Sequence, residues 1–202
     1  MVGMGRTGSI RRETEETRVR VRVDLDGSGV ADVETGLPFF DHLLEQLAVH
    51  GGLDLEVRAE GDLEVDDHHL VEDVGICLGR ALDEALGDRR GIRRMAWSAV
   101  PMDGSLVLCA LDLSGRAYFR VSGFRPSRPG IGEPPLSLEN VPHFWRSLCE
   151  HSGTTMHVEF RAWDNDHHAV EAMFKAVARA LREAVEVVGE SVPSTKGRLR
   201  RG

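Results

Sequence analysis

The chain lacks the features that define several large classes of protein. Only three cysteines occur among its 202 residues, Cys77, Cys109 and Cys149, and none forms a CxxC pair. Such an odd and scattered set excludes a disulfide framework and offers no zinc or redox motif, so we expect buried thiols. No apolar run approaches the roughly 20 residues that span a bilayer, and the N-terminus has no signal-peptide core.

The chain also lacks an excess of positive charge. The formal net charge is −8, whereas a nucleic-acid-binding surface is basic. Arg11-Arg12 and the arginines of 198–201 are expected to be solvated chain ends. With 41% hydrophobic residues, the chain can bury a substantial core. These properties predict a cytoplasmic protein without nucleic-acid or membrane partners.

What the chain does contain is one histidine motif in two copies. The stretch DHHLVE at 67–72 recurs as DHHAVE at 166–171, 99 positions further along. His42 and His143, 101 positions apart, precede the two copies. We infer a duplication in which both halves take part in chemistry. Residues 1–90 form the first half and 91–202 the second, and together they are expected to make one compact domain.

Hydrophobic periodicity predicts a similar order of elements in both halves. The expected strands are 18–25, 30–35 and 53–57, then 95–101, 105–113, 115–122 and 156–160. The expected helices are 39–50, 67–87, 141–151 and 167–188. The turn at 26–29 suggests that the second strand returns beside the first, and 124–137 is expected to be a long loop. Each half is therefore a small sheet with two helices, and packing helices on helices predicts a sheet–helices–sheet sandwich.

The motif residues are suited to hold metal ions. His68 and Glu72 share one helix face, whereas the neighbouring imidazoles of His68 and His69 point about 100° apart. We therefore expect each His-His pair to be shared between two ions, with His42 and His143 completing the shells. Each ion would receive three imidazoles and one carboxylate, a set that suits Mn²⁺, Fe²⁺, Co²⁺ or Zn²⁺ better than Ca²⁺.

A second group of polar residues could bind an anion. Lys175 lies one helical turn beyond Glu171, where the first repeat has Ile76. The segment 193–197, PSTKG, offers hydroxyl groups, a lysine and a flexible backbone. Arg94 and Arg116 flank strands of the second half. Without other support, such a segment is more often a plain turn, and such arginines more often form surface ion pairs.

Several motifs together resemble the imidazoleglycerol-phosphate dehydratase family: FFDHLL at 39–44, DHHLVED at 67–73, LSGR at 113–116, DHHAVEAMFKA at 166–176 and PSTKG at 193–197. The resemblance extends from about residue 12 to 199. It implies a hydro-lyase of histidine biosynthesis that converts imidazoleglycerol phosphate to imidazoleacetol phosphate through a metal-stabilised imidazolate. It also implies two Mn²⁺ ions per active site and a cubic homo-oligomer of 24 subunits with active sites between chains.

The resemblance further implies a fold and a role for individual residues. The fold is α+β, with a mixed four-stranded sheet and two helices in each half, similar to domain 2 of ribosomal protein S5. The implied metal ligands are His42, His68, His69, Glu72, His143, His167, His168 and Glu171. The implied substrate contacts are Glu16, His42, His50, Arg94, Arg116, Lys175, Ser194 and Lys196. Glu16 is the candidate for proton transfer, and the catalytic group also includes His69, His168, Glu72 and Glu171.

Two other functions remain open at this point. A dinuclear hydrolase also surrounds paired metals with imidazoles and carboxylates. It would use bridging aspartates, for which Asp67 and Asp166 are the only obvious candidates. A metal-storage or metal-sensing protein is the alternative without catalysis. Such a protein would not need Lys175 or the PSTKG segment.

Overall fold

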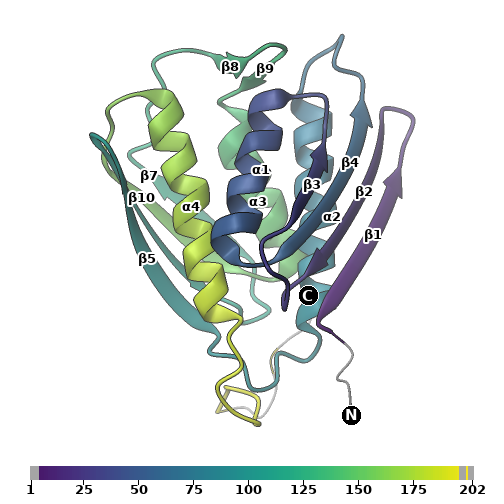
Figure 1. The fold of residues 1–202 in the computed structure, drawn as a ribbon, viewed down its shortest axis with the longest axis vertical. Helices are drawn as coiled ribbons and strands as arrows, with labels where there is room; N and C mark the ends of the chain where they lie inside the picture. The colour runs from purple at the N-terminus through teal and green to yellow at the C-terminus, as the bar shows by residue number, and fades with distance from the viewer. Residues whose placement is uncertain (1–4, 196–198, 200–202) are drawn as a thin grey trace.

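Two four-stranded sheets enclose a layer of four helices (Figure 1). The computed structural model describes residues 5–195 and residue 199. Its elements are β1 (Thr7–Glu13), β2 (Thr17–Asp24), β3 (Ala31–Glu34), α1 (Pro38–Gly51), β4 (Asp54–Gly61), α2 (His68–Leu86), β5 (Met95–Met102), β6 (Ser105–Asp112), β7 (Tyr118–Ser122), β8 (Gly130–Gly132), β9 (Pro135–Ser137), α3 (Asn140–Ser152), β10 (Thr155–Ala162) and α4 (Asp166–Ala184).

Both large sheets have the same topology. The first has the order β1-β2-β4-β3, and the second has the order β5-β6-β10-β7. In each sheet the first three strands are antiparallel, and the last strand pairs parallel to its neighbour. The expected fold class, two mixed four-stranded sheets that enclose their helices, is therefore confirmed.

Two local expectations in the first sheet were wrong. Arg11 and Arg12 are not part of a loose chain end, because they lie in β1. The Arg11 side chain is exposed, but Arg12 forms a 2.7 Å ion pair with the buried carboxylate of Asp73. The strand after the 26–29 turn does not form a hairpin with β2. It is β3, which pairs parallel to β4 after the crossover through α1.

The helices pack across the two halves of the chain. α1 contacts α4, and α2 contacts α3. Phe40 of α1, Phe144 and Trp145 of α3, and Phe174 of α4 are almost completely buried. Their rings form a connected cluster, with the centroids of contacting pairs 4.7–5.7 Å apart. Such contacts stabilise beyond the area they bury, so this cluster joins the halves.

Two glycines let α2 approach α3 closely. A Cβ added to Gly75 would lie 2.8 Å from the carbonyl oxygen of Phe144, and one added to Gly79 would lie 2.6 Å from that of Leu148. Real Cβ atoms essentially never come this close. The spacing of the two glycines, one turn apart on the same face, therefore sets how closely the two helices can pack.

The segment between β7 and α3 crosses the end of the molecule where the helices begin, and it carries the short hairpin β8–β9 (Figure 1). The aspartates that open the two histidine motifs hold it at both ends. Asp166 accepts hydrogen bonds from the backbone N–H groups of Ser127 and Arg128. Asp67 accepts from the backbone N–H of Ser137 at 2.7 Å and from the amide of Asn140 at 2.9 Å. The expected long loop at 124–137 is thus anchored to both histidine motifs, and we call it the strap.

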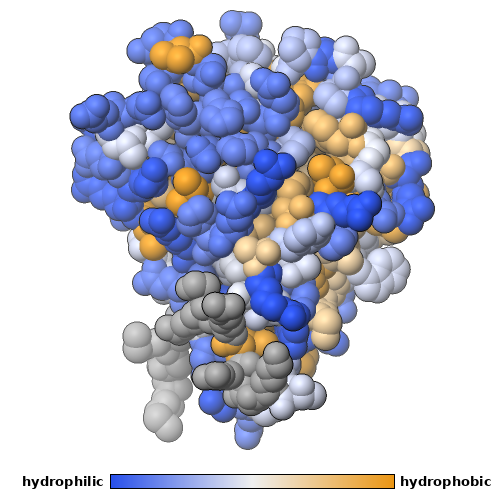
Figure 2. Space-filling model, turned by 180° about the vertical axis from the view of Figure 1, so that it is seen from behind, coloured by the Kyte–Doolittle hydropathy of each residue, from blue (hydrophilic) through white to orange (hydrophobic). Residues whose placement is uncertain are grey.

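The outer faces of the two sheets differ in chemistry. Arg18, Arg20 and Arg22 alternate outward along β2. On the second sheet, Trp97 of β5 is 67% exposed and Tyr118 of β7 is 55% exposed. From behind, hydrophilic residues dominate the side of the first sheet, and hydrophobic ones gather toward the side of the second (Figure 2).

The three cysteines are buried and unbonded, as expected from their spacing. Burial raises the pKa of Cys77 to about 11 and that of Cys109 to about 12, so neither thiol is a nucleophile near neutral pH. Among the described residues, no helix has the length and apolar character needed to cross a bilayer.

Replacing Gly79 with valine should destabilise the protein by about 1–3 kcal/mol or more, because the side chain would force α2 away from α3. Chemical denaturation measures the change. Gly189→Val is the matched control, since a Cβ there meets nothing within 4 Å. Equal stability of the two variants would contradict the close helix contact.

Replacing Asp166 with asparagine should also destabilise the protein, by about 1–3 kcal/mol, because an amide presents a donor to groups that are themselves donors. Besides the strap, these include the Trp163 indole N–H at 3.0 Å. Hydrogen exchange at Ser127 and Arg128 should accelerate, and Asp164→Asn, at a 52% exposed side chain, should leave it unchanged. Unchanged protection in Asp166→Asn would show that the carboxylate does not hold the strap.

Candidate metal centres

One cluster of potential metal ligands forms where α1 lies beside α4. His42 comes from the first turns of α1, and His167 and Glu171 come from the first turns of α4. Glu171 Oε2 lies 3.1 Å from His42 Nε2 and 3.0 Å from His167 Nε2. The remote histidine of one half therefore meets the histidine motif of the other half.

The second cluster is the counterpart of the first and lies where α2 meets α3. It consists of His68 and Glu72 from α2 and His143 from α3. Glu72 Oε1 lies 3.2 Å from His143 Nε2, and the rings of His68 and His143 stack with centroids 4.5 Å apart. In both clusters, the possible ligand atoms lie within 4.8 Å of one another.

The second cluster contains a buried nitrogen that makes no hydrogen bond. His143 Nε2 contacts Glu72 Oε1 at 3.2 Å without forming a hydrogen bond, and burying a polar atom in this way carries a free-energy cost. His68 has its Nδ1 3.1 Å from Asn140 Oδ1. With Nδ1–H donating to Asn140, Nε2 of His68 is a free acceptor that can bind a cation. The donor set and the buried His143 nitrogen without a hydrogen bond fit a divalent metal ion.

The second histidine of each motif belongs to neither cluster. The ring of His69 is turned 88° from that of His68, and the ring of His168 is turned 86° from that of His167. His69 Nδ1 lies 3.3 Å from Asp62 and 3.6 Å from Glu16. The hydrogen bond to Asp62 is the main reason that the pKa of His69 is raised.

His168 has a similar environment. Its Nδ1 lies 2.7 Å from the side-chain nitrogen of Asn165 and 3.3 Å from Asp103 Oδ2. In both motifs the second imidazole is thus engaged through Nδ1, which leaves Nε2 for another ligand. The sequence predicted that adjacent imidazoles of each motif point apart, and the ring angles confirm it. The structure adds that carboxylates lie beside the second imidazole of each motif, Asp62 and Glu16 beside His69 and Asp103 beside His168.

The two clusters differ in electrostatics. Lys175 Nζ lies 2.6 Å from Glu171 Oε1, and the Glu171 side chain is only 7% exposed. Burial acts to raise the pKa of Glu171, but hydrogen bonds from Lys175 and His42 outweigh it and lower the pKa to about 2. At the equivalent position of α2 stands Ile76, and the Glu72 side chain is 38% exposed.

The proposed anion-binding residues have varied environments. Arg94 forms a bidentate ion pair with Asp112 at 2.7 and 2.9 Å and donates to the carbonyl of Pro193. Its guanidinium therefore anchors the segment that contains Ser194. Arg116 is 69% exposed and 3.9 Å from Asp112. Lys196 lies outside the described residues.

His50 lies at the other end of α1 from His42, with basic residues nearby. It is part of a pocket of about 480 Å³ that is also lined by Arg179 and Arg182 of α4 and by Glu183 and Glu186. Burial, and then the charges of Lys175 and Arg179, lower the pKa of His50. Within one chain, His50 is therefore not part of either ligand cluster.

Sequence reasoning missed three residues that contact the motif histidines. Asn140 links Asp67 to the His68 imidazole. Asp62 contacts His69, and the ring of Phe39 lies 4.9 Å from that of His167. Asn140 and Phe39 occupy the positions three before His143 and His42, so the repeat itself could have drawn attention to both.

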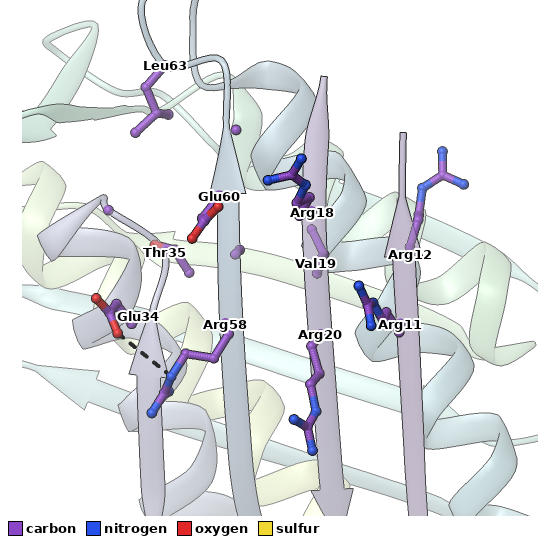
Figure 3. A pocket seen from close by; sticks show the side chains of 13 residues that line it. Arg11, Arg12, Arg18, Val19, Arg20, Glu34, Thr35, Arg58, Glu60 and Leu63 are labelled. Carbon is purple, nitrogen blue, oxygen red and sulfur yellow. Dashed lines mark ion pairs between the residues drawn. The ribbon is translucent and has the colours of Figure 1, made fainter. Parts of the chain in front are cut away.

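A shallow pocket of about 540 Å³ on the outer face of the first sheet lies away from both clusters. The pairing register places Arg11, Arg20 and Arg58 opposite one another on neighbouring strands (Figure 3). These arginines have carboxylate partners, such as Asp32 at 2.5 Å and Glu34 at 3.7 Å for Arg58. We assign no chemistry to this pocket.

The aspartates of the two motifs are already engaged. Asp67 and Asp166 are buried and accept hydrogen bonds from the strap. Neither carboxylate belongs to a ligand cluster among the described residues. The bridging aspartates expected of a dinuclear hydrolase are therefore not provided by these two residues.

Comparison with known proteins agrees with this geometry. The sequence profile of the imidazoleglycerol-phosphate dehydratase family matches residues 35–181. An imidazoleglycerol-phosphate dehydratase of Methanopyrus kandleri is 68% identical over 98% of both chains. The bifunctional histidine biosynthesis protein HisB of Stenotrophomonas maltophilia is 53% identical over 96% of this chain, which spans 53% of that longer protein.

Solved structures show the same architecture. The imidazoleglycerol-phosphate dehydratase of Staphylococcus aureus is 30% identical, with a TM-score of 0.80, over 90% of this chain and 99% of that one. The Pyrococcus furiosus enzyme, solved in complex with (S)-C348, is 34% identical, with a TM-score of 0.80, over 94% of this chain and all of that one. The chain therefore belongs to the imidazoleglycerol-phosphate dehydratases, the hydro-lyases that act in histidine biosynthesis.

Proposed function

We propose that the two clusters hold two Mn²⁺ ions per active site for the dehydration of imidazoleglycerol phosphate to imidazoleacetol phosphate. The observation that carries this proposal is the meeting, twice in one chain, of two imidazoles and a carboxylate within 4.8 Å. The buried His143 Nε2, which makes no hydrogen bond, supports it, and the mixed nitrogen and oxygen donors suit a metal such as Mn²⁺. When bound, the cations supply Lewis-acid stabilisation of charge on the substrate.

The protein's own residues would orient the substrate and move the proton. Removing a proton beside a carbinol is difficult, because no carbonyl group stabilises the resulting charge. Glu16 lies 3.6 Å from His69 and is our candidate for accepting that proton, in an arrangement typical of a general base. Lys175, Arg94, Arg116, Ser194 and Lys196 would hold the phosphate and so align the carbon chain for elimination.

We propose further that active sites form between chains of a cubic 24-subunit assembly. Each cluster supplies two imidazoles and one carboxylate, one imidazole fewer than the three that we expect for each ion. The second histidines of the two motifs, His69 and His168, belong to neither cluster in their own chain, and their rings are turned 88° and 86° from those of His68 and His167. A second chain would supply them, and the exposed Trp97 and Tyr118 offer apolar surface for self-association.

Glu72→Gln and Glu171→Gln should each lose bound metal and activity together, because an amide is a much weaker ligand than a carboxylate. Elemental analysis gives the metal content, and release of imidazoleacetol phosphate gives the activity. Activity should fall at least about 100-fold, the upper range seen even for residues that only support metal ligands. Glu150→Gln, on the exposed side of α3, is the control. Full metal content with normal turnover in either variant would contradict the assignment.

Two inactive variants should restore activity when they are combined. A chain with His42→Ala keeps its His69, and a chain with His69→Ala keeps both clusters, so mixed assemblies can contain complete sites. The two proteins are unfolded together, refolded with Mn²⁺ and assayed, and each variant refolded alone is the control. If the mixture is as inactive as its components, the sites do not form between chains.

A further inference from the structure

The ion pair between Lys175 and Glu171 distinguishes one metal cluster from the other. Lys175 Nζ lies 2.6 Å from Glu171 Oε1, while the other carboxylate oxygen faces His42 and His167. A cation bound by this cluster would share Glu171 with the lysine ammonium, and the two positive charges would repel each other. The cluster on α2 and α3 has Ile76 at the equivalent position and escapes this competition.

The position of Lys175 determines where its ammonium could move. The next turn of α4 carries Arg179, and His50 of α1 lies near enough that both cations oppose its protonation. The adjoining pocket contains Arg182 as well. Its carboxylates, Glu183 and Glu186, are themselves paired with Arg93 at 3.8 and 2.6 Å. If the Lys175 ammonium moved away from Glu171, it would therefore enter a basic environment. That position is unfavourable unless an anion is present.

We propose that Lys175 couples cation binding at the cluster of His42, His167 and Glu171 to binding of a phosphomonoester. Without the anion, the ammonium neutralises Glu171 and weakens cation binding there. With the anion, the ammonium pairs with phosphate and releases the carboxylate to the cation. The cluster of His68, Glu72 and His143 fills first, and the other cluster fills together with the phosphorylated ligand. This inference rests on the proposed metal function.

Linkage makes the coupling reciprocal, so a phosphomonoester must tighten cation binding by the same factor as the cation tightens phosphomonoester binding. Mn²⁺ titration of chelator-treated, full-length protein measures the first factor, either by calorimetry or by the electron paramagnetic resonance signal of free Mn²⁺. Glycerol 3-phosphate is the probe, because it carries a phosphomonoester but no imidazole. We expect two classes of site, with the weaker class tightened about tenfold by the probe.

Lys175→Met should bring the Mn²⁺ affinities of the two classes of site within about threefold of each other. It should also abolish the effect of glycerol 3-phosphate on Mn²⁺ binding. Lys175→Arg retains the positive charge and should keep the two classes distinct, which separates loss of charge from disturbed folding. The wild-type comparison with and without the probe needs no variant at all. Two equal classes in the wild type, or an undiminished probe effect in Lys175→Met, would overturn the coupling. A chain that binds no Mn²⁺ under any condition would instead overturn the proposed metal function.

Discussion

The packing of each half's first helix against the other half's second helix is the constraint on which the rest of this structure depends. Neither half contains a complete cluster, because His42 stands on α1 and its partners stand on α4, while His143 stands on α3 and its partners stand on α2. The buried aromatic rings of α1, α3 and α4 and the close approach of α2 to α3 at its two glycines fix these helix pairs. A shift of one helix would therefore separate ligand atoms that must lie within a few ångströms of each other.

The duplication produced two clusters that are similar in geometry but unequal in chemistry. One has a carboxylate neutralised by a lysine and a histidine packed on Phe39. The other has a more exposed carboxylate and a histidine held by Asn140, which in turn contacts Asp67. Unequal supporting residues tune metal affinity even when the direct ligands are the same. Two clusters with unequal surroundings are therefore suited to cations of unequal affinity, as we propose for this protein.

The sequence was sufficient for the helices and for most strands, because their apolar residues follow regular periods. It did not predict β1, because Ile10 is the one large apolar residue among its inward positions, which also include Gly8 and Arg12. Gly8 allows close contact with α2 at Ala81, and Arg12 pairs with buried Asp73. The parallel pairing of β3 was also missed, because a turn signal says nothing about a partner that arrives after a helix.

For the candidate site, the repeated motif predicted the divergence of adjacent imidazoles, which follows from helix geometry, and it drew attention to the histidines and glutamates that the structure groups into clusters. It could not predict which residues meet across the halves, because that depends on tertiary packing. Asn140, Asp62 and Phe39 were missed for the same reason, because each contacts a histidine that belongs to a different segment of the fold. Asn140 and Phe39 share one position of the repeat, whereas Asp62 has no such signal in the sequence.

The central claim is that each chain places two separate cations, one in each cluster. Anomalous X-ray diffraction from crystals of the Mn²⁺-loaded protein tests it most directly. The account predicts two manganese peaks per chain, one bounded by His42, His167 and Glu171 and the other by His68, Glu72 and His143. Peaks at other residues, or none at saturating Mn²⁺, would contradict it.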